Sequence, residues 1–282
     1  MHYDKLLISP TALARALDDG DVTVLDCRFA LADPTWGGRA YEAEHIPGAH
    51  FVDLDRDLSS PVATHGGRHP LPDAGSFATR MRDLGLRQDH IAVVYDDSRM
   101  AFAARAFWLL RYLGHLDVRV LDGGFAGWKA AGQDATPATP QGAVPGDFAA
   151  RPDPSLVATR DDLLALNRAE RTRIPLIDAR LPPRYRGEEE PIDPVAGHIP
   201  GAVCVPWQGF TFPDGRAIPE QENRERWSWL PNNATPIVYC GSGVTACVNV
   251  LSLLAAGHER TRLYAGSWSD WCSYPDAAVE TG

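Results

Sequence analysis

The sequence predicts an α/β protein made of two similar halves, each a mainly parallel sheet flanked by helices. Three observations lead to this prediction: the length of 282 residues, motifs that occur twice, and an alternation of short apolar runs with helical segments. A chain of this length exceeds the usual domain of about 100 to 200 residues. Its hydrophobic fraction of 44% is enough to build a core.

Two motifs recur at nearly constant spacing. Val24–Arg28 (VLDCR) recurs as Leu176–Arg180 (LIDAR), 152 residues later. His45–Ala49 (HIPGA) recurs unchanged as His198–Ala202, 153 residues later. Similarity at a fixed offset indicates duplicated structural units. We expect the repeated HIPG motifs to be structural, since both copies carry them.

A stretch rich in proline and glycine, Gly132–Gly146, separates the two copies. Such residues remove backbone donors and favour extended or turning chain. We therefore expect a linker and place the domain boundary near residue 140, which gives domains 1–140 and 141–282.

Within each copy, β-branched apolar runs predict strands and segments of helical period predict helices. The expected strands are 22–25, 91–95, 118–121, 176–177, 237–239 and 262–264, and the expected helices include 11–17, 162–166 and 246–256. Ser9 is expected to cap the first helix, with Pro10 at its first position. This alternation is typical of a parallel sheet with helices on both faces.

Composition and charge exclude several functions. The net charge is −10 and no dense Lys/Arg run is present, so nucleic acid is not an expected partner. No apolar run approaches the roughly 18 residues needed to cross a bilayer. We expect a soluble, cytoplasmic protein without a membrane partner.

The five cysteines indicate reduced thiols. Their number is odd, and their spacing fits neither a disulfide framework nor the close ligand pairs of a zinc site. No metal and no cofactor are expected. Cys27, Cys204, Cys247 and Cys272 are expected to pack in the fold, with redox pairing of Cys247 and Cys240 as a minor alternative.

Cys240 is the expected nucleophile. Ligands of open parallel sheets bind beyond the carboxyl ends of the strands, and there the second copy has Cys240–Thr245 (CGSGVT) whereas the first has Asp96. Glycines on both sides of Ser242 let successive N–H groups converge on an anion. Such surroundings favour a nucleophilic thiolate. A cysteine that merely packs at a strand end would not account for this loop.

With these motifs, the whole chain resembles the tandem-domain rhodanese family of 3-mercaptopyruvate and thiosulfate sulfurtransferases. Both HIPG motifs, Arg184–Gly187 (RYRG), the CGSGVT loop and Gly266–Trp268 (GSW) carry the resemblance. It implies two rhodanese-like domains, of which the first is catalytically silent. Asp96 in place of cysteine agrees with that.

The resemblance implies that Cys240 takes sulfur from 3-mercaptopyruvate as a persulfide and passes it to a thiol, a thioredoxin-like protein or cyanide. The loop N–H groups would stabilise the anionic sulfur; the loop residues are Gly241, Gly243, Val244 and Thr245. Ser242, Asp55 and His69 would form a proton relay. His65 is a rival for His69, because the stretch from Asp55 to His69 is longer than the family pattern.

The family also holds the carboxylate of its donor with two arginines. Arg184 matches the first of them, but the second falls in the acidic stretch 188–193. Arg186 is a candidate substitute, since a guanidinium binds carboxylates through two parallel hydrogen bonds. It is equally compatible with a solvated surface charge.

Three alternatives stay open at this point. Thiosulfate is an alternative donor for the same persulfide mechanism. A cysteine phosphatase on a related scaffold would need an arginine six positions after the cysteine, where Ala246 stands. A third interpretation, from another class, is a non-catalytic sulfur-relay or redox-sensing module that docks on a partner enzyme.

Overall fold

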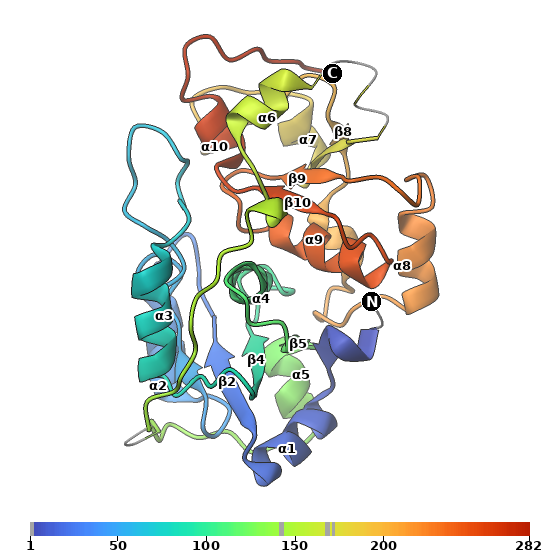
Figure 1. Ribbon diagram of the computed structural model, residues 1–282. Helices are drawn as coiled ribbons and strands as arrows, with labels where there is room; N and C mark the ends of the chain where they lie inside the picture. The colour runs from blue at the N-terminus through green and yellow to red at the C-terminus, as the bar shows by residue number, and fades with distance from the viewer. Residues whose placement is uncertain (1–2, 141–143, 167–169, 171–172) are drawn as a thin grey trace.

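The computed structural model describes residues 3–140, 144–166, 170 and 173–282. It contains two five-stranded sheets whose strand pairs are all parallel. The strand orders are β1-β5-β4-β2-β3 and β6-β10-β9-β7-β8, so the second sheet repeats the topology of the first. In Figure 1 the first sheet lies in the lower half of the molecule and the second in the upper half.

The first half is built from the following elements. Its strands are β1 (Leu7–Ile8), β2 (Val22–Asp26), β3 (His50–Phe51), β4 (Ile91–Tyr95) and β5 (Val118–Leu121). Its helices are α1 (Pro10–Asp19), α2 (Trp36–Ala43), α3 (Ala74–Asp83), α4 (Ala103–Tyr112) and α5 (Gly124–Ala130), with a 3-10 turn η1 (Tyr3–Lys5).

The second half follows the same plan. Its strands are β6 (Val157–Ala158), β7 (Leu176–Asp178), β8 (Val203–Cys204), β9 (Ile237–Tyr239) and β10 (Arg262–Tyr264). Its helices are α6 (Arg160–Ala165), α7 (Pro182–Tyr185), α8 (Glu220–Arg226), α9 (Ala246–Ala255) and α10 (Ser267–Trp271), with 3-10 turns η2 (Pro154–Leu156) and η4 (Trp207–Phe210).

The predicted α/β class and the six predicted strands are confirmed. Ser9 caps α1, because its hydroxyl accepts a hydrogen bond from Ala12 N at 3.2 Å, and Pro10 follows at the first helical position. The sequence analysis missed the edge strands β1, β3, β6 and β8, which have two residues each. Two residues are too few to show the alternation by which a strand is recognised.

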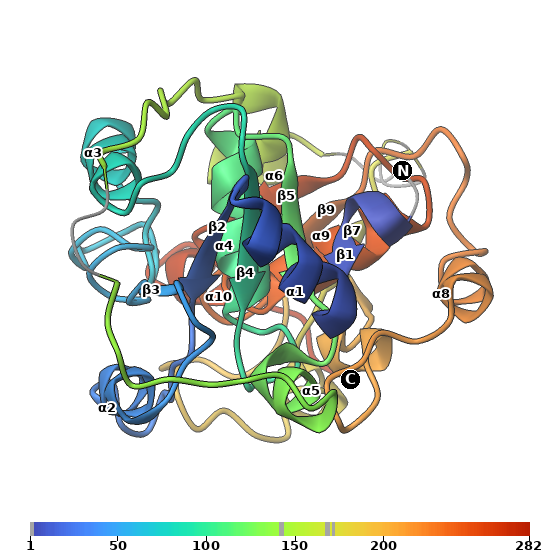
Figure 2. The same cartoon turned by 90° about the horizontal axis from the view of Figure 1, so that it is seen from below.

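The two halves share one hydrophobic core. The inner face of each sheet contributes to it, and α4 of the first half packs against α9 of the second. Separate clusters cover the outer faces, under α1 and α5 in the first half and under α6 and α10 in the second. Figure 1 shows α4 end-on between the sheet of the first half and α9 of the second, and Figure 2, seen from below, shows the same helix from the side.

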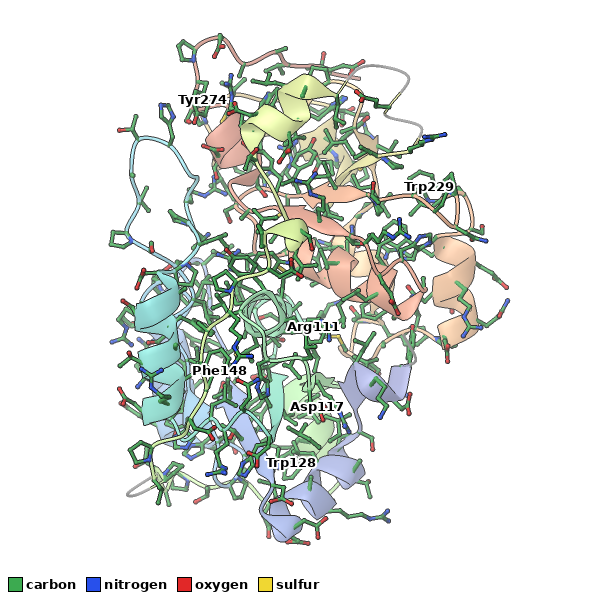
Figure 3. The ribbon with its side chains drawn as sticks, in the orientation of Figure 1. Arg111, Asp117, Trp128, Phe148, Trp229 and Tyr274 are labelled. Atoms are coloured by element: carbon green, nitrogen blue, oxygen red, sulfur yellow. The ribbon has the colours of Figure 1, made fainter. Side chains whose placement is uncertain are left out.

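Residues at and just beyond the end of the predicted linker pack on the first half. Gly146 N donates to Arg82 O at 2.8 Å, and Phe148 N donates to Leu86 O at 3.2 Å. Phe148 is fully buried, and Figure 3 shows it beside the sheet of the first half. Residues 141–143 of the linker lie outside the described residues, and the boundary near residue 140 stays a prediction.

The HIPG motifs have the structural role that their repetition predicts. The imidazole of His45 stacks on Tyr41 with ring centroids 3.9 Å apart, and its Nδ1 lies 2.7 Å from Tyr41 O. His198 stacks on Tyr185 at 3.7 Å, with Nδ1 2.7 Å from Tyr185 O. Among the described helices, none is long and apolar enough to span a membrane.

Candidate active site

Cys240 lies where the buried strand β9 ends, and its side chain is 2% exposed. Ser267 holds its backbone: Cys240 N donates to Ser267 Oγ at 3.1 Å, and Trp268 N donates to Cys240 O at 3.0 Å. Ser267 has a φ of 56°, and its hydroxyl donates to Tyr264 O at 2.9 Å. The GSW motif therefore positions the cysteine.

The loop from Gly241 to Thr245 offers a row of free backbone donors. None of these five N–H groups has an acceptor within the part of the chain that the structure describes. Gly243 is required at the turn, because its φ is 76° and a side-chain Cβ there would lie only 2.1 Å from Ala265 O. Unpaired N–H groups beside a buried sulfur form a site for an anion.

The same loop in the first half is filled by a side chain. The carboxylate of Asp96 accepts from Ser98 N, Met100 N, Phe102 N and Ala103 N at 2.7 to 3.1 Å. Asp96 is 2% exposed. A carboxylate of the chain itself thus occupies the position that an external anion would take, and this loop has no thiol.

Ser242, His69 and Asp55 form a chain of contacts across the two halves. His69 Nδ1 lies 2.8 Å from Ser242 Oγ, and His69 Nε2 lies 3.4 Å from Asp55 Oδ1. Burial, together with the positive charges of Arg105 and Arg68, lowers the pKa of His69 to about 4. The imidazole is therefore neutral near neutral pH and can accept the hydroxyl proton of Ser242.

His65, the rival candidate, lies elsewhere. Its ring stacks on Tyr274 with centroids 3.9 Å apart, and its Nδ1 lies 2.7 Å from Ser273 Oγ. It does not line the cavity that contains Cys240. The structure therefore brings His69, and not His65, to Ser242.

A buried guanidinium contacts both His69 and the loop that follows Cys240. Arg105 of α4 is 0% exposed and donates to Gly243 O at 3.1 Å. It also donates to His69 O at 3.1 Å and to Leu58 O at 3.3 Å. No carboxylate in the described residues pairs with it, and burial lowers its pKa. Sequence reasoning missed this residue, because it lies within an apolar helix and belongs to no motif.

Cys240 opens into a cavity of about 400 Å³ between the two halves. Its walls include His69 and Phe102 from the first half and Arg184, Ser242 and Trp207 from the second. A cleft between domains that contains a few polar groups is the usual form of a small-molecule site.

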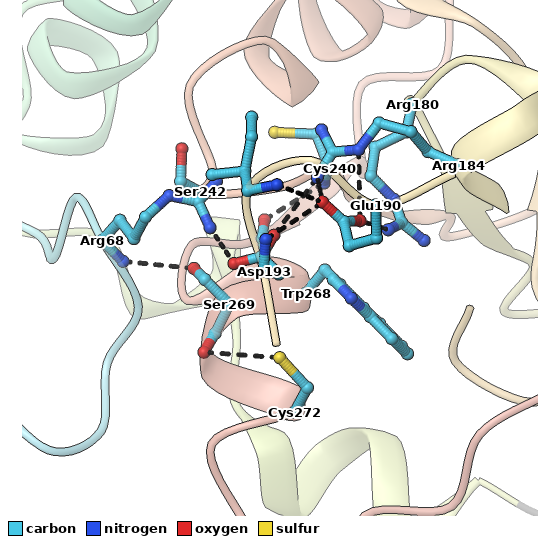
Figure 4. Close-up of polar contacts among 12 residues, drawn as sticks. Arg68, Arg180, Arg184, Glu190, Asp193, Cys240, Ser242, Trp268, Ser269 and Cys272 are labelled. Atoms are coloured by element: carbon cyan, nitrogen blue, oxygen red, sulfur yellow. Dashed lines mark hydrogen bonds and ion pairs between the residues drawn. The ribbon is translucent and has the colours of Figure 1, made fainter. Parts of the chain in front are cut away.

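The predicted arginines differ in position. Arg184 lines the cavity and pairs with Glu190 at 2.6 Å and with Asp193 at 3.2 Å, as the dashed lines in Figure 4 show. Arg186 pairs with Glu188 at 2.7 Å on the surface and does not line the cavity. Arg68, which the sequence analysis did not select, lines the cavity and pairs with Asp193.

The other cysteines lie outside the cavity, and all five are free thiols. Cys247 is fully buried, its Sγ lies 3.4 Å from Gly243 O, and burial raises its pKa to about 12. Burial likewise raises the pKa of Cys204 to about 11. In the described ranges, no group of three or more His, Cys, Asp or Glu side chains is arranged to bind a metal ion.

Known proteins resemble the chain over its full length. The family described as "Rhodanese-like domain" matches residues 9–131 and 159–274. A Pseudomonas aeruginosa protein named "Probable 3-mercaptopyruvate sulfurtransferase" is 50% identical, with 98% of each chain covered. The Cricetulus griseus thiosulfate sulfurtransferase is 32% identical, over 99% of this chain and 96% of its own.

A solved structure agrees with these relatives. The 3-mercaptopyruvate sulfurtransferase from Leishmania major superposes with a TM-score of 0.83 at 29% identity, covering 95% of this chain and 74% of its own. The matches fall on both halves, which share one sheet topology. The chain belongs to the rhodanese family and carries two rhodanese-like domains.

Proposed function

We propose that the protein is a sulfurtransferase that carries sulfur as a persulfide on Cys240, with 3-mercaptopyruvate as the donor. The observation that carries the proposal is the buried thiol of Cys240 beside five unpaired backbone N–H groups at an interdomain cavity. The names of relatives at 50% and 35% identity support the donor. The sulfur donor is then a small molecule, and the sulfur acceptor is a small molecule or the thiol of a partner protein.

The transfer step balances without a cofactor. The Cys240 thiolate attacks the sulfur of 3-mercaptopyruvate, a sulfur–sulfur bond forms, and the bond from sulfur to C3 breaks. The electron pair of that bond passes to the enolate of pyruvate, and the proton of the donor thiol moves to C3. The N–H groups of the loop stabilise the terminal sulfur of the persulfide anion. A thiol, a thioredoxin-like protein or cyanide then attacks that sulfur.

Ser242, His69 and Asp55 are the proposed proton relay. The Ser242 hydroxyl takes the proton of the donor thiol as its own proton passes to His69, and the return path delivers a proton to C3. Asp55 orients the imidazole through Nε2. Such acid–base assistance typically contributes 10²–10⁴-fold. Arg184 is the proposed contact of the donor carboxylate; Arg186 is left out of the proposal, because it pairs with Glu188 at the surface.

The first domain is proposed to be silent, because Asp96 fills the loop that would otherwise hold an anion. The five free cysteines support a reducing compartment such as the cytoplasm. Ala246, at the first position of α9, leaves a phosphoryl group without the arginine that a cysteine phosphatase uses.

Intact mass and product release test this function. The reduced protein is incubated separately with 3-mercaptopyruvate and with thiosulfate, and Cys240→Ser and Cys204→Ser serve as matched variants. We expect one sulfur atom to be gained on Cys240, faster from 3-mercaptopyruvate, with release of pyruvate. Cys204→Ser should behave like the unchanged protein.

The other outcomes are equally informative. Faster loading from thiosulfate would keep the persulfide and change the donor. No sulfur gained from either donor, with partner binding retained in Cys240→Ser, would replace the enzyme with a sulfur-relay or redox-sensing module.

A further inference from the structure

The active cavity holds a guanidinium that the proposed function does not yet use. Arg68 reaches the cavity from the first domain, whereas Arg184 reaches it from α7 of the second. We propose that Arg68 and Arg184 together form a clamp for the carboxylate of the donor, built across the domain interface. This inference rests on the proposed function only for the identity of that donor.

Asp193 fixes both guanidinium groups. Its Oδ1 pairs with Arg68 Nη1 and its Oδ2 lies 3.2 Å from Arg184 Nη2, so one carboxylate lies between the two arginines, as Figure 4 shows. The side chain of Asp193 is 3% exposed, against 31% for Arg68 and 17% for Arg184. The carboxylate of Asp193 is therefore buried, whereas the side chains of both arginines remain partly exposed at the cavity.

Each arginine keeps a free donor next to the catalytic cysteine. Arg68 Nη2 and Arg184 Nη1 donate to no acceptor in the described ranges of the chain. A Cβ placed on Gly241 would lie 3.1 Å from Arg68 Nη2 and 3.4 Å from Arg184 Nη1. Both free donors thus lie over the residue that follows Cys240, where a donor whose sulfur contacts Cys240 has its carboxylate within reach.

A lengthened loop delivers Arg68 to this position. The loop is fastened to the second domain by Gly66 N, which donates to Asp270 Oδ1 at 2.7 Å, and by Arg68 N, which donates to Ser269 Oγ at 3.1 Å. Gly67 has a φ of 81°, and a Cβ there would lie 2.4 Å from Gly266 O. These contacts hold the backbone of Arg68 against α10, so the side chain points at Gly241.

The stretch that follows Arg184 offers no second cation. It reads Glu188-Glu-Glu-Pro-Ile-Asp193, and Ile192 lines the cavity there. Arg186 is held at the surface by Glu188. Within the described cavity lining, Arg68 is the guanidinium left to complete a pair with Arg184, because Arg180 is 3% exposed and bound to Asp178 and Glu190. Hydrogen bonds from a guanidinium to a carboxylate are charge-assisted and stronger than neutral ones, so a second guanidinium adds to the binding of the donor carboxylate.

Alkylation of Cys240 tests the clamp without relying on sulfur transfer. Iodoacetate carries a carboxylate and iodoacetamide does not, so the ratio of their rates at Cys240 reports carboxylate binding beside the thiol. We expect Arg68→Met to lower this ratio about tenfold, the effect of losing one charge-assisted contact. Arg68→Lys, which keeps the charge for Asp193 but loses the planar fork, should give an intermediate ratio, and Arg186→Met should leave it unchanged.

Sulfur loading gives a second readout. Arg68→Met should raise KM for 3-mercaptopyruvate about tenfold with kcat within about threefold, the pattern of lost ground-state binding. Loading from mercaptoacetone, which lacks the carboxylate, should not change.

Three results would overturn the clamp. They are an alkylation ratio in Arg68→Met within twofold of the unchanged protein, equal losses with iodoacetate and iodoacetamide, and equal losses with both sulfur donors. The last two would assign Arg68 a purely structural role through Asp193. If the unchanged protein gains no sulfur, the proposed function fails, whereas the alkylation ratio still decides the role of Arg68.

Discussion

At the scale of single residues, burial decides which groups can exchange protons. His69 is 7% exposed and lies near two guanidinium groups, so its pKa falls to about 4. The unfolded chain binds a proton at this histidine below about pH 6.5, whereas the folded chain does so only near pH 4. Its contribution to folding stability therefore decreases as the pH falls from 6.5 to 4 and is constant below that.

The same shift predicts the acid side of the activity profile. We expect the His69 base to remain available at pH 5, so that kcat for sulfur loading is lost through this group only as the pH approaches 4. His69→Gln should lower kcat by about 10²–10⁴-fold and remove this dependence, whereas His65→Gln should change neither. Stopped-flow loading from pH 4 to 8 measures it, and loss of activity near pH 6.5 in the unchanged protein, absent from His69→Gln, would contradict the assignment.

At the scale of elements, the equivalent loops β4–α4 and β9–α9 differ in what their backbone N–H groups bind. In the β9–α9 loop the N–H groups of Gly241 to Thr245 have no acceptor among the described residues, whereas N–H groups of the β4–α4 loop donate to Asp96. That internal carboxylate holds Arg99 and Met100 at positive φ, 58° and 69°. Arg99 in turn donates to Gln208 O and Thr211 O, both at 2.5 Å, so the β4–α4 loop contacts the second domain.

Asp96→Asn should therefore destabilise the protein. An amide NH₂ cannot accept hydrogen bonds, so buried N–H groups lose their partner, at a cost on the order of 1–3 kcal/mol. Asp97→Asn is the matched control. The contact of Asp97 with Arg28 is long, at 3.8 Å, and burial raises the pKa of Asp97 to about 6, so replacing this carboxylate by a neutral amide should change the stability little. Urea unfolding measures both variants, and equal stabilities would show that the four hydrogen bonds of Asp96 contribute little.

The central strands and the loops next to them were also the part of the fold that the sequence predicted best. The strands 91–95 and 237–239 were predicted with their observed bounds, because each is an uninterrupted apolar run. The Cys240 loop was found because a nucleophile, two glycines and a following helix are adjacent in the chain. His69 stood as one of two candidates, since only folding places it 2.8 Å from Ser242.

At the scale of the whole molecule, the two domains are packed against each other. They share a hydrophobic core, and Arg105 from α4 donates to Gly243 O in one domain and to His69 O in the other. In Figure 1, α4 lies between the two halves. The cavity is lined by side chains from both domains, so its shape depends on this packing.

Arg105→Met should weaken that packing. Three carbonyl groups lose a charged donor in a fully buried position, so we expect the free energy of unfolding to fall by about 2–4 kcal/mol. Sulfur loading should also slow by about tenfold or more, because both loops shift. Arg111→Met is the control, since Arg111 lies on the same helix but is only partly buried and donates to Leu116 O near the surface. A single unfolding transition for the unchanged protein, by fluorescence and circular dichroism, would support one cooperative unit.

The duplicated α/β fold, the place of Asp96 in the loop of the first copy and the candidate nucleophile Cys240 could all be inferred from the chain alone, because they depend on motifs whose residues are sequence neighbours. Arg186 was considered as a substitute for the second arginine because its guanidinium can bind a carboxylate and it lies in the same RYRG motif as Arg184. The packing of the domains instead leaves Arg186 paired with Glu188 outside the cavity and brings Arg68, more than a hundred residues earlier, over Gly241. Contacts between distant segments depend on how the domains pack, and no local pattern encodes them.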